Sequence, residues 1–402
     1  MTPVPVERGV PVIGISGSYG GLNVGDEAIL TSILAELRRV APGVELVVFS
    51  RDLGHTQRHH DVDRTVNGRD VLKADIGAEV DRLDLLLLGG GGILYDREAG
   101  SYLQVAEIAQ RRGIPTATYA IGGGPLMRTV ERQAVADVVE RMQLVTVREM
   151  SAKRLFEQIG VEQDVVVTAD PALLLEPEPF TEAMLAREGV IKERALVGMS
   201  VREPGGATAE IGHAAYHALL ANAADYIVAR FDADVLFVPM ERQDIREAHR
   251  VMADMGLADR ASVLKGAYSP GQVLGLMQHL ELAVGMRLHF LIFAANAGVP
   301  PVALPYASKV VSFLERLGLP TPQMIHREHV GALLASIDRL WDERHRQREL
   351  LCERIPPMRV EAARTAALVA DLLASGARPS GAPSRRPGVV ASSRVGPVDR
   401  AG

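Results

Sequence analysis

The chain has 402 residues, of which 47% are hydrophobic and 23% are charged, and its formal net charge is −6. This length favours two domains, the composition is ordinary for a soluble globular protein, and the negative balance excludes a global basic field for binding nucleic acid. A single cysteine, Cys352, excludes a disulfide framework and a zinc site built from paired cysteines.

The sequence contains no run of about 18 apolar residues, which a membrane-spanning helix would need. Its first segment, MTPVPVERGV, lacks the charged-then-apolar layout of a signal peptide. We therefore expect a cytoplasmic protein.

A glycine-rich turn follows the first predicted strand, which spans residues 10–15. The turn leads into an amphipathic helix, and Asp26 stands where the helix N-cap is expected. The turn is not a triphosphate-binding loop, because Asp26 and Glu27 follow the glycine where GxxxxGK[ST] needs lysine, and its glycines do not fall as GxGxxG. A carboxylate beside open glycine backbone suits the hydroxyls of a sugar, whereas the plain alternative makes Asp26 only a helix cap.

The connection after the second predicted strand contains His55, His59 and His60, with Asp61 and Asp63 beside them. These residues resemble a metal site in composition, but no helical period aligns their side chains. We expect a solvated loop here and no metal.

A second glycine cluster follows the apolar run that ends at Leu88 and consists of Gly89, Gly90, Gly91 and Gly92. Consecutive glycines carry a high entropy cost, so either a ligand or a tight strand-to-helix crossing must need the backbone close. Further strand–loop–helix units place Arg148 and then Asp170 just after predicted strands. Units at this spacing predict a doubly wound parallel sheet.

The second half of the chain repeats this plan after a connection marked by Pro177 and Pro179. One strand ends at Arg202, and another ends at Gly285, with Arg287 and His289 just beyond it. Ligands of open α/β sheets bind beyond the carboxyl ends of the strands, so these side chains should face a ligand. Arginine binds phosphate or carboxylate and histidine moves protons near neutral pH, which together indicate acid/base chemistry on an anion.

We therefore expect an α/β protein with two facing Rossmann-like domains and a ligand cleft between them. The N-terminal domain should span residues 1–175, the interdomain connection 176–194 and the C-terminal domain 195–345. C-terminal helices should occupy 346–376. Residues 377–402, rich in Pro, Gly, Ser and Arg, should form a disordered, solvated tail, with peripheral association of its arginines with the inner membrane face as the weaker alternative.

Several motifs together resemble the polysaccharide pyruvyl transferase family, close to its bacterial cell-wall type. In chain order they are GSYGGLNVGDEAIL, LLLLGGGGILYD, YAIGGGPL, VREMSAKRLFEQIGV, ADPALLL and VGMRLHFLIFAANAGVPPVALPYASKV. The resemblance covers about residues 10 to 345. It implies a GT-B-like fold and a transferase that moves a pyruvyl group from phosphoenolpyruvate, a co-substrate, to two hydroxyls of a sugar as a ketal, with no cofactor.

The resemblance associates the Arg-Leu-His element, here Arg287, Leu288 and His289, with the donor site. We expect His289 to transfer the proton, and Arg287, Arg202 and more weakly Arg148 to hold the donor anion. The residues expected to face the acceptor, a sugar or lipid-linked glycan, are Asn23, Asp26, Gly89, Gly90, Gly91 and Gly92.

Two other functions fit the same sequence. A GT-B nucleotide-sugar glycosyltransferase would share the architecture, and a non-catalytic sugar-binding relative would bind the donor without turnover.

Overall fold

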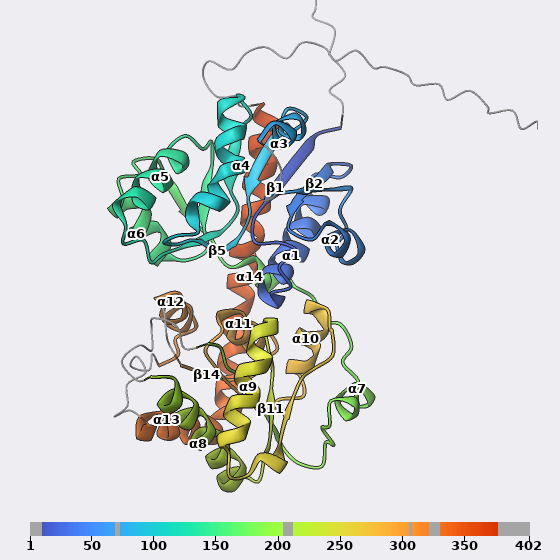
Figure 1. Ribbon diagram of the computed structural model, residues 1–402, viewed down its shortest axis with the longest axis vertical. Coiled ribbons are helices and arrows are strands. Elements are labelled where there is room, and N and C mark those ends of the chain that lie inside the picture. The colour runs from blue at the N-terminus through green and yellow to red at the C-terminus, as the bar shows by residue number, and fades with distance from the viewer. Residues whose placement is uncertain (1–9, 69–72, 204–211, 305–307, 321–329, 377–402) are drawn as a thin grey trace, which may run out of the picture.

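The computed structural model describes residues 10–68, 73–203, 212–304, 308–320 and 330–376. Figure 1 shows two lobes, with the N-terminal lobe in blue to green above the C-terminal lobe in yellow to orange. The predicted tail after residue 376 lies outside the described residues.

The N-terminal lobe is built on a parallel sheet with the order β3-β2-β1-β4-β6. Its strands are β1 (Val12–Ser16), β2 (Glu45–Ser50), β3 (Arg64–Asn67), β4 (Leu85–Leu88) and β6 (Thr116–Thr118). Its helices are α1 (Val24–Val40), α2 (Leu53–His59), α3 (Lys73–Val80), α4 (Ala99–Arg111), α5 (Thr129–Val139) and α6 (Met150–Gln158). β1 is central and buried on both faces, which is why it is continuously apolar apart from its glycine and final serine.

A second parallel sheet in this lobe has the order β5-β7-β8-β9. Its strands are β5 (Gly91–Leu94), β7 (Ile121–Gly123), β8 (Val145–Val147) and β9 (Val165–Val167). Only Gly89 and Gly90 separate β4 from β5, and only Tyr119 and Ala120 separate β6 from β7. The chain therefore bends from one sheet into the other at the glycine cluster.

The C-terminal lobe has one parallel sheet with the order β12-β11-β10-β13-β14. Its strands are β10 (Leu196–Ser200), β11 (Asp234–Phe237), β12 (Ala261–Val263), β13 (Leu282–Gly285) and β14 (Pro301–Ala303). Helices and turns of this half are η1 (Pro171–Leu174), α7 (Glu182–Arg187), α8 (His213–Phe231), α9 (Arg242–Asp254), η3 (Ala258–Arg260), α10 (Pro270–Met277), α11 (Leu288–Asn296), α12 (Ser308–Leu317) and α13 (Val330–Asp342). In both five-stranded sheets the first strand lies between the second and the fourth, as in a Rossmann half, so the predicted α/β class with two Rossmann-like sheets is confirmed.

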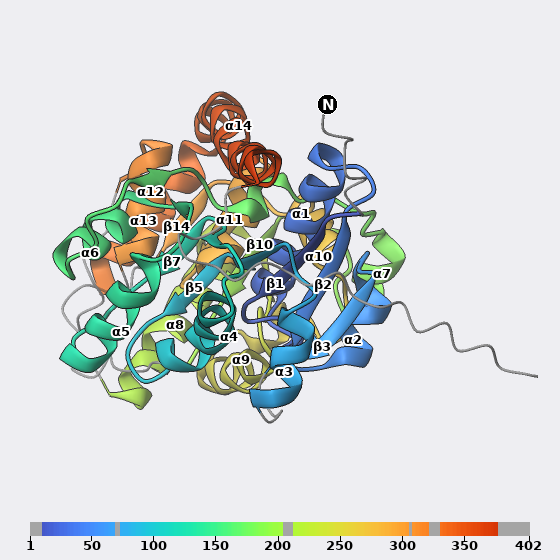
Figure 2. The ribbon, with the colours of Figure 1, turned by 90° about the horizontal axis from the view of Figure 1, so that it is seen from above.

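The long helix α14 (Arg344–Ser375) passes from the lower lobe to the upper one along one side of the molecule (Figures 1 and 2). The sequence predicted C-terminal helices over residues 346–376, and the structure has one helix there, with Pro356 and Pro357 inside it, while the preceding helix α13 ends at Asp342. A proline inside a helix removes a backbone hydrogen bond. Here a buried stripe including Leu351, Ile355 and Ala362 continues past both prolines and packs against the two lobes.

The two lobes share one hydrophobic core, which includes Ile33 of α1, Leu173 of η1, Phe293 of α11 and Ala366 of α14. A backbone hydrogen bond also joins the lobes, because the Val24 amide donates to the Met240 carbonyl at 2.9 Å. Within the described ranges no helix combines the length and hydropathy that crossing a membrane requires.

Gly89 and Gly90 serve packing inside the upper lobe. A Cβ atom at Gly89 would lie 2.0 Å from the Tyr19 hydroxyl, and one at Gly90 would lie 2.9 Å from Ile29 Cγ2. Tyr19 is fully buried and cannot swing away without opening the core. These two glycines therefore suit the tight crossing that the sequence left as one alternative.

We expect the Gly89→Ala variant to lose about 1–3 kcal/mol of unfolding free energy, because the added methyl overpacks the site beside Tyr19. Gly100→Ala is the matched control, since a Cβ there, in the first turn of α4, meets nothing within 4 Å. Urea unfolding of both variants checks the difference. Equal stability of the two would contradict this account of Gly89.

Candidate functional site

A buried ion-pair group lies at the carboxyl ends of β8 and β9. The guanidinium of Arg148, which is 3% exposed, donates from Nε to Glu149 Oε2 at 2.8 Å and from Nη1 to Asp170 Oδ2 at 2.7 Å. Burial alone would raise the pKa of Asp170, but Arg148 and His289 hold that pKa well below its usual value. Asp170 is thus a fixed negative charge.

His289 reaches this group from the C-terminal lobe. Its Nε2 lies 3.6 Å from Asp170 Oδ2 and has no hydrogen-bond partner among the described residues, although the atom is buried. The ring packs on the first turn of α1, where a Cβ at Gly25 would lie 1.9 Å from His289 Nδ1. Any larger residue at position 25 would clash with the imidazole. The His289 ring therefore belongs to the C-terminal lobe and contacts the N-terminal lobe at Gly25.

Asp26 and the second half of the glycine cluster complete the group. Burial raises the pKa of the Asp26 carboxyl, and the nearby charges of His289 and Arg148 oppose that rise. A Cβ at Gly91, where φ is +106°, would lie 3.3 Å from Asp26 Oδ1. One at Gly92 would lie 3.3 Å from Arg148 Nη2 and 3.5 Å from Lys309 Nζ.

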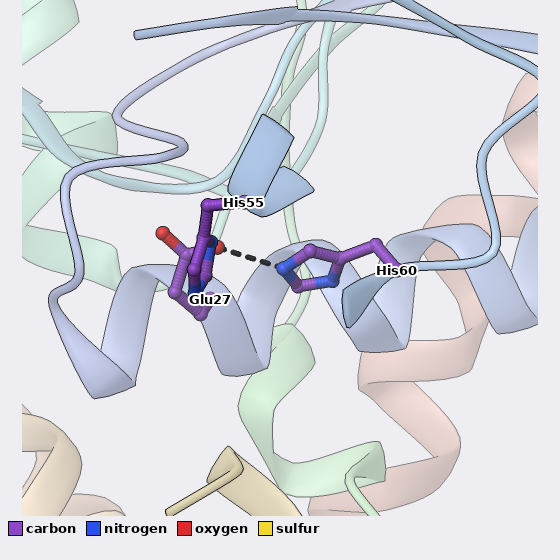
Figure 3. A group of neighbouring side chains, drawn as sticks. All are labelled: Glu27, His55 and His60. Carbon is purple, nitrogen blue, oxygen red and sulfur yellow. Dashed lines mark hydrogen bonds and ion pairs between the residues drawn. The ribbon is translucent and has the colours of Figure 1, made fainter. Parts of the chain in front are cut away.

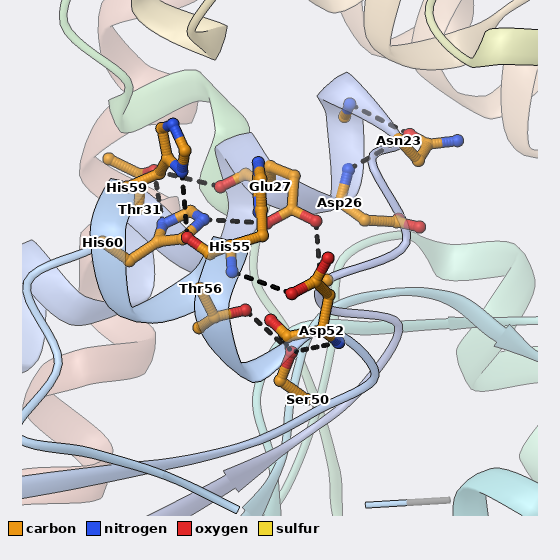
Figure 4. Close-up of polar contacts among 12 residues, drawn as sticks. Asn23, Asp26, Glu27, Thr31, Ser50, Asp52, His55, Thr56, His59 and His60 are labelled. Carbon is orange, nitrogen blue, oxygen red and sulfur yellow. Dashed lines mark hydrogen bonds and ion pairs between the residues drawn. The ribbon is translucent and has the colours of Figure 1, made fainter. Parts of the chain in front are cut away.

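The structure corrects the expected cap of α1. Asn23, not Asp26, is the N-cap, and its side-chain oxygen accepts from the backbone amides of Gly25 and Asp26 at 3.0 and 3.2 Å (Figure 4). Asp26 stands in the first helical turn instead, where a negative charge interacts favourably with the helix dipole. Its carboxyl group is therefore available to the charged group, whereas the Asn23 oxygen is committed to capping.

Arg287 and His289 have different partners. The Arg287 guanidinium binds both carboxylate oxygens of Asp244, at 3.0 and 2.6 Å, and also pairs with Glu241. Arg287 is the N-cap of α11 and His289 lies two positions on, so the two side chains leave the helix about 200° apart. Their closeness in sequence therefore does not place both groups on one ligand.

The other predicted donor residues are dispersed. Leu288 lines a small cavity together with Arg148, Asp170 and Lys309. Arg202 follows β10, where its Nε donates to the neighbouring carbonyl of Glu203 at 3.3 Å. The structure thus groups Arg148, Asp26, Gly91, Gly92 and His289 at the lobe junction, whereas the contacts of Arg202 and Arg287 are with other residues.

Three members of the group were not among the predicted site residues: Glu149, Asp170 and Lys309. Asp170 and Glu149 come directly after predicted strands, which is the signal that could have identified them. The group as a whole sets an imidazole against one ionised carboxylate and a second carboxyl of raised pKa, with two cations beside open glycine backbone. Such an arrangement can bind an anion and transfer protons beside it.

We expect Asp170→Asn to lower the free energy of unfolding by about 3–5 kcal/mol at pH 7, because Arg148 loses one of its two buried carboxylate partners. The pKa of Asp170 is lower in the folded than in the unfolded state, so its contribution is full above the unfolded pKa and is lost as pH falls towards the folded pKa. The gap in stability between wild type and variant should therefore shrink from pH 7 to about pH 3.

Urea unfolding of both proteins at the two pH values measures that gap. A gap that stays constant or widens on acidification would show that Asp170 is not held ionised by its neighbours.

Comparison with solved structures gives the fold. The chain is similar to a putative UDP-N-acetylglucosamine 2-epimerase from Listeria monocytogenes, with 12% identity, a TM-score of 0.65, and coverage of 92% of this chain and 99% of that one. UDP-GlcNAc 2-epimerase from Neisseria meningitidis has 10% identity and a TM-score of 0.61, with coverage of 91% of this chain and 100% of that one. ADP-heptose lps heptosyltransferase II from E. coli has 14% identity and a TM-score of 0.50, with coverage of 84% of this chain and 100% of that one. At these identities the likeness concerns the GT-B-type fold alone.

No curated protein matches the chain significantly. The family model for polysaccharide pyruvyl transferase, however, matches residues 23–308, from the N-cap of α1 to the start of α12. This span is more than half of the chain and includes His289 and every residue of the charged group except Lys309, which follows directly. The chain belongs to the polysaccharide pyruvyl transferase family.

Proposed function

We propose that this protein transfers a pyruvyl group from phosphoenolpyruvate to two hydroxyls of a sugar in a cell-envelope glycan or its lipid-linked precursor. The observation that carries the proposal is the buried His289–Asp170–Arg148 group at the lobe junction, in a chain of this family. Phosphoenolpyruvate combines a phosphate, a carboxylate and an enol carbon that must be protonated. The group supplies cations and a proton-transferring imidazole in one place.

The reaction moves two protons without redox change, because the two sugar hydroxyls lose one each and the methylene carbon and the departing phosphate gain one each. One sugar hydroxyl attacks C2 of the enol while the methylene carbon takes a proton, the C–O bond to phosphate breaks, and the second hydroxyl closes the ketal. We assign the protonation of the methylene to His289, whose Nε2 faces Asp170 at 3.6 Å. We assign the acceptance of a hydroxyl proton to Asp26, whose carboxyl has a raised pKa.

Donor anion binding is assigned to Arg148 Nη2 and Lys309, which converge on the backbone at Gly92. The ion pairs of Arg148 with Glu149 and Asp170 use Nε and Nη1, and Nη2 is turned towards Gly92. A role of Arg287 in donor binding stays a prediction, since an anion there would compete with Asp244 and Glu241.

We expect His289→Ala to reduce phosphoenolpyruvate-dependent pyruvylation about 10²–10⁴-fold, which is the usual contribution of a general acid. His345→Ala, at an exposed position on α14, is the control and should retain full activity. Phosphate release is measured with phosphoenolpyruvate and a panel of sugar acceptors, and circular dichroism checks folding. Full turnover by folded His289→Ala would refute the role of this residue.

The same assay separates the runner-up functions. Release of nucleotide from a sugar nucleotide, with none of phosphate from phosphoenolpyruvate, would identify a glycosyltransferase. Binding of phosphoenolpyruvate in calorimetry without turnover would identify a non-catalytic relative.

We expect Gly92→Ala to raise the KM for phosphoenolpyruvate about 10–100-fold, because the methyl would stand between Arg148 Nη2 and Lys309 Nζ and displace one charge-assisted hydrogen bond. Gly100→Ala again serves as the control. Steady-state kinetics at varied phosphoenolpyruvate concentration tests this. An unchanged KM would show that the donor anion does not bind beside Gly92.

A further inference from the structure

Glu27, His55 and His60 form a second polar group on the other side of α1. Asp26 and Glu27 are adjacent in the first turn of α1, and their side chains point apart (Figure 4). The histidines were expected in a solvated loop, but residues 53–59 form α2, and the His60 side chain is only 2% exposed. The fold thus aligns side chains that the sequence pattern left unaligned.

The Glu27 carboxylate is buried and held in one orientation. The backbone amide of Gly20 donates to Oε1 at 2.9 Å, and Oε2 lies 2.8 Å from His60 Nε2 (Figure 3). One oxygen is therefore occupied by the glycine-rich turn, while the other is directed at the histidines.

The tautomer of His60 decides what its Nε2 can bind, and Thr31 contacts the opposite ring nitrogen. The Thr31 hydroxyl donates its proton to the Glu27 carbonyl at 3.0 Å and lies 3.2 Å from His60 Nδ1. With the proton directed to that carbonyl, the hydroxyl accepts from His60, and this arrangement has the ring proton on Nδ1. In the neutral ring Nε2 then carries a lone pair, and this lone pair faces an oxygen of Glu27 that also only accepts.

His55 adds a third lone pair. Its Nδ1 is buried and has no hydrogen-bond partner in the part of the chain that the structure describes. Stacking on His59, with ring centroids 4.3 Å apart, fixes the ring plane. Glu27, His55 and His60 each offer one ligand atom, and these three atoms lie within 4.8 Å of one another. A small shift of the side chains would bring all three into contact with one ion.

The group opens into a cavity of about 450 Å³ between the lobes. Glu27, His55 and His60 line one wall, and Arg242, Lys265 and Tyr268 of the C-terminal lobe line another. A metal held by three protein ligands at such a wall would keep coordination positions free for water or for an oxygen of an anionic ligand.

We propose that Glu27, His55 and His60 bind a divalent transition-metal ion of the zinc class, with an open coordination position facing this cavity. Two imidazoles and one carboxylate are ligands of borderline softness, which favour zinc, cobalt or iron over magnesium and calcium. Thr31 acts as a positioning residue, because its hydroxyl holds the His60 ring in the metal-binding tautomer.

The competing account is a hydrogen bond from a protonated Nε2 of His60 to Glu27, with the ring neutral or charged. Such a bond would account for the 2.8 Å contact but needs nothing from His55. The two accounts therefore differ in what the loss of His55 does to metal binding.

The test is calorimetric titration of the full-length protein, stripped with chelator, with Zn²⁺, and absorption spectroscopy with Co²⁺. We expect one ion per chain, with affinity reduced at least about 10–100-fold in Glu27→Gln and His55→Ala and about tenfold or more in Thr31→Val. His345→Ala is the control, because this exposed histidine of α14 does not line the cavity, and it should bind within about threefold of wild type.

Absence of one-to-one binding by the wild-type protein would overturn the proposal in favour of the hydrogen bond. Equal losses in His55→Ala and His345→Ala would also overturn it, since they would indicate adsorption to exposed histidines. Metal binding is measured without phosphoenolpyruvate, so the outcome is independent of the proposed transferase activity.

Discussion

The lobe junction depends on the buried guanidinium of Arg148. A charge so far from water is stable only when it is paired, and Glu149 and Asp170 provide the partners. The pairing keeps Asp170 ionised and directs it towards His289 of the other lobe. Arg316 fixes the backbone on which Arg148 stands, because its Nη1 donates to the carbonyls of Arg148 and Thr168 at 3.0 and 2.8 Å. The need to pair the buried charge of Arg148 in the N-terminal lobe therefore determines which groups surround the His289 imidazole of the C-terminal lobe.

The first turn of α1 contributes one residue to each polar group, Asp26 to the group around Arg148 and Glu27 to the group with His55 and His60. Successive helical residues point about 100° apart, so Asp26 faces the glycine cluster and Arg148 while Glu27 faces His60. The turn also contacts the C-terminal lobe, through the amide of Val24 and through the close approach of His289 to Gly25. Any change in the spacing of the lobes would therefore alter both groups together.

The GT-B-type fold explains why such groups occur at this place. Parallel strands end at the same edge of a sheet, and loops after β1, β8, β9 and β13 carry the polar side chains that meet between the lobes. α14 and the shared core fix the edges of the two lobes against each other. The solved structures of similar fold show the fold alone, and the family rests on the match over residues 23–308.

The sequence alone determined the parallel α/β architecture, the family and the position of His289 next to a strand end, because apolar runs, glycine turns and motifs are local patterns. The tertiary structure decided which charges meet. Arg148 and Asp170 are 22 positions apart, and Arg287 and Asp244 are 43 apart, and no local period encodes such pairs. Tertiary packing likewise decided three further features. Helix α14 continues past two prolines, the N-cap of α1 is Asn23 and not Asp26, and His60 is buried against Glu27. These outcomes depend on the free energy of burying charge and apolar surface between distant segments, which appears only once the chain is folded.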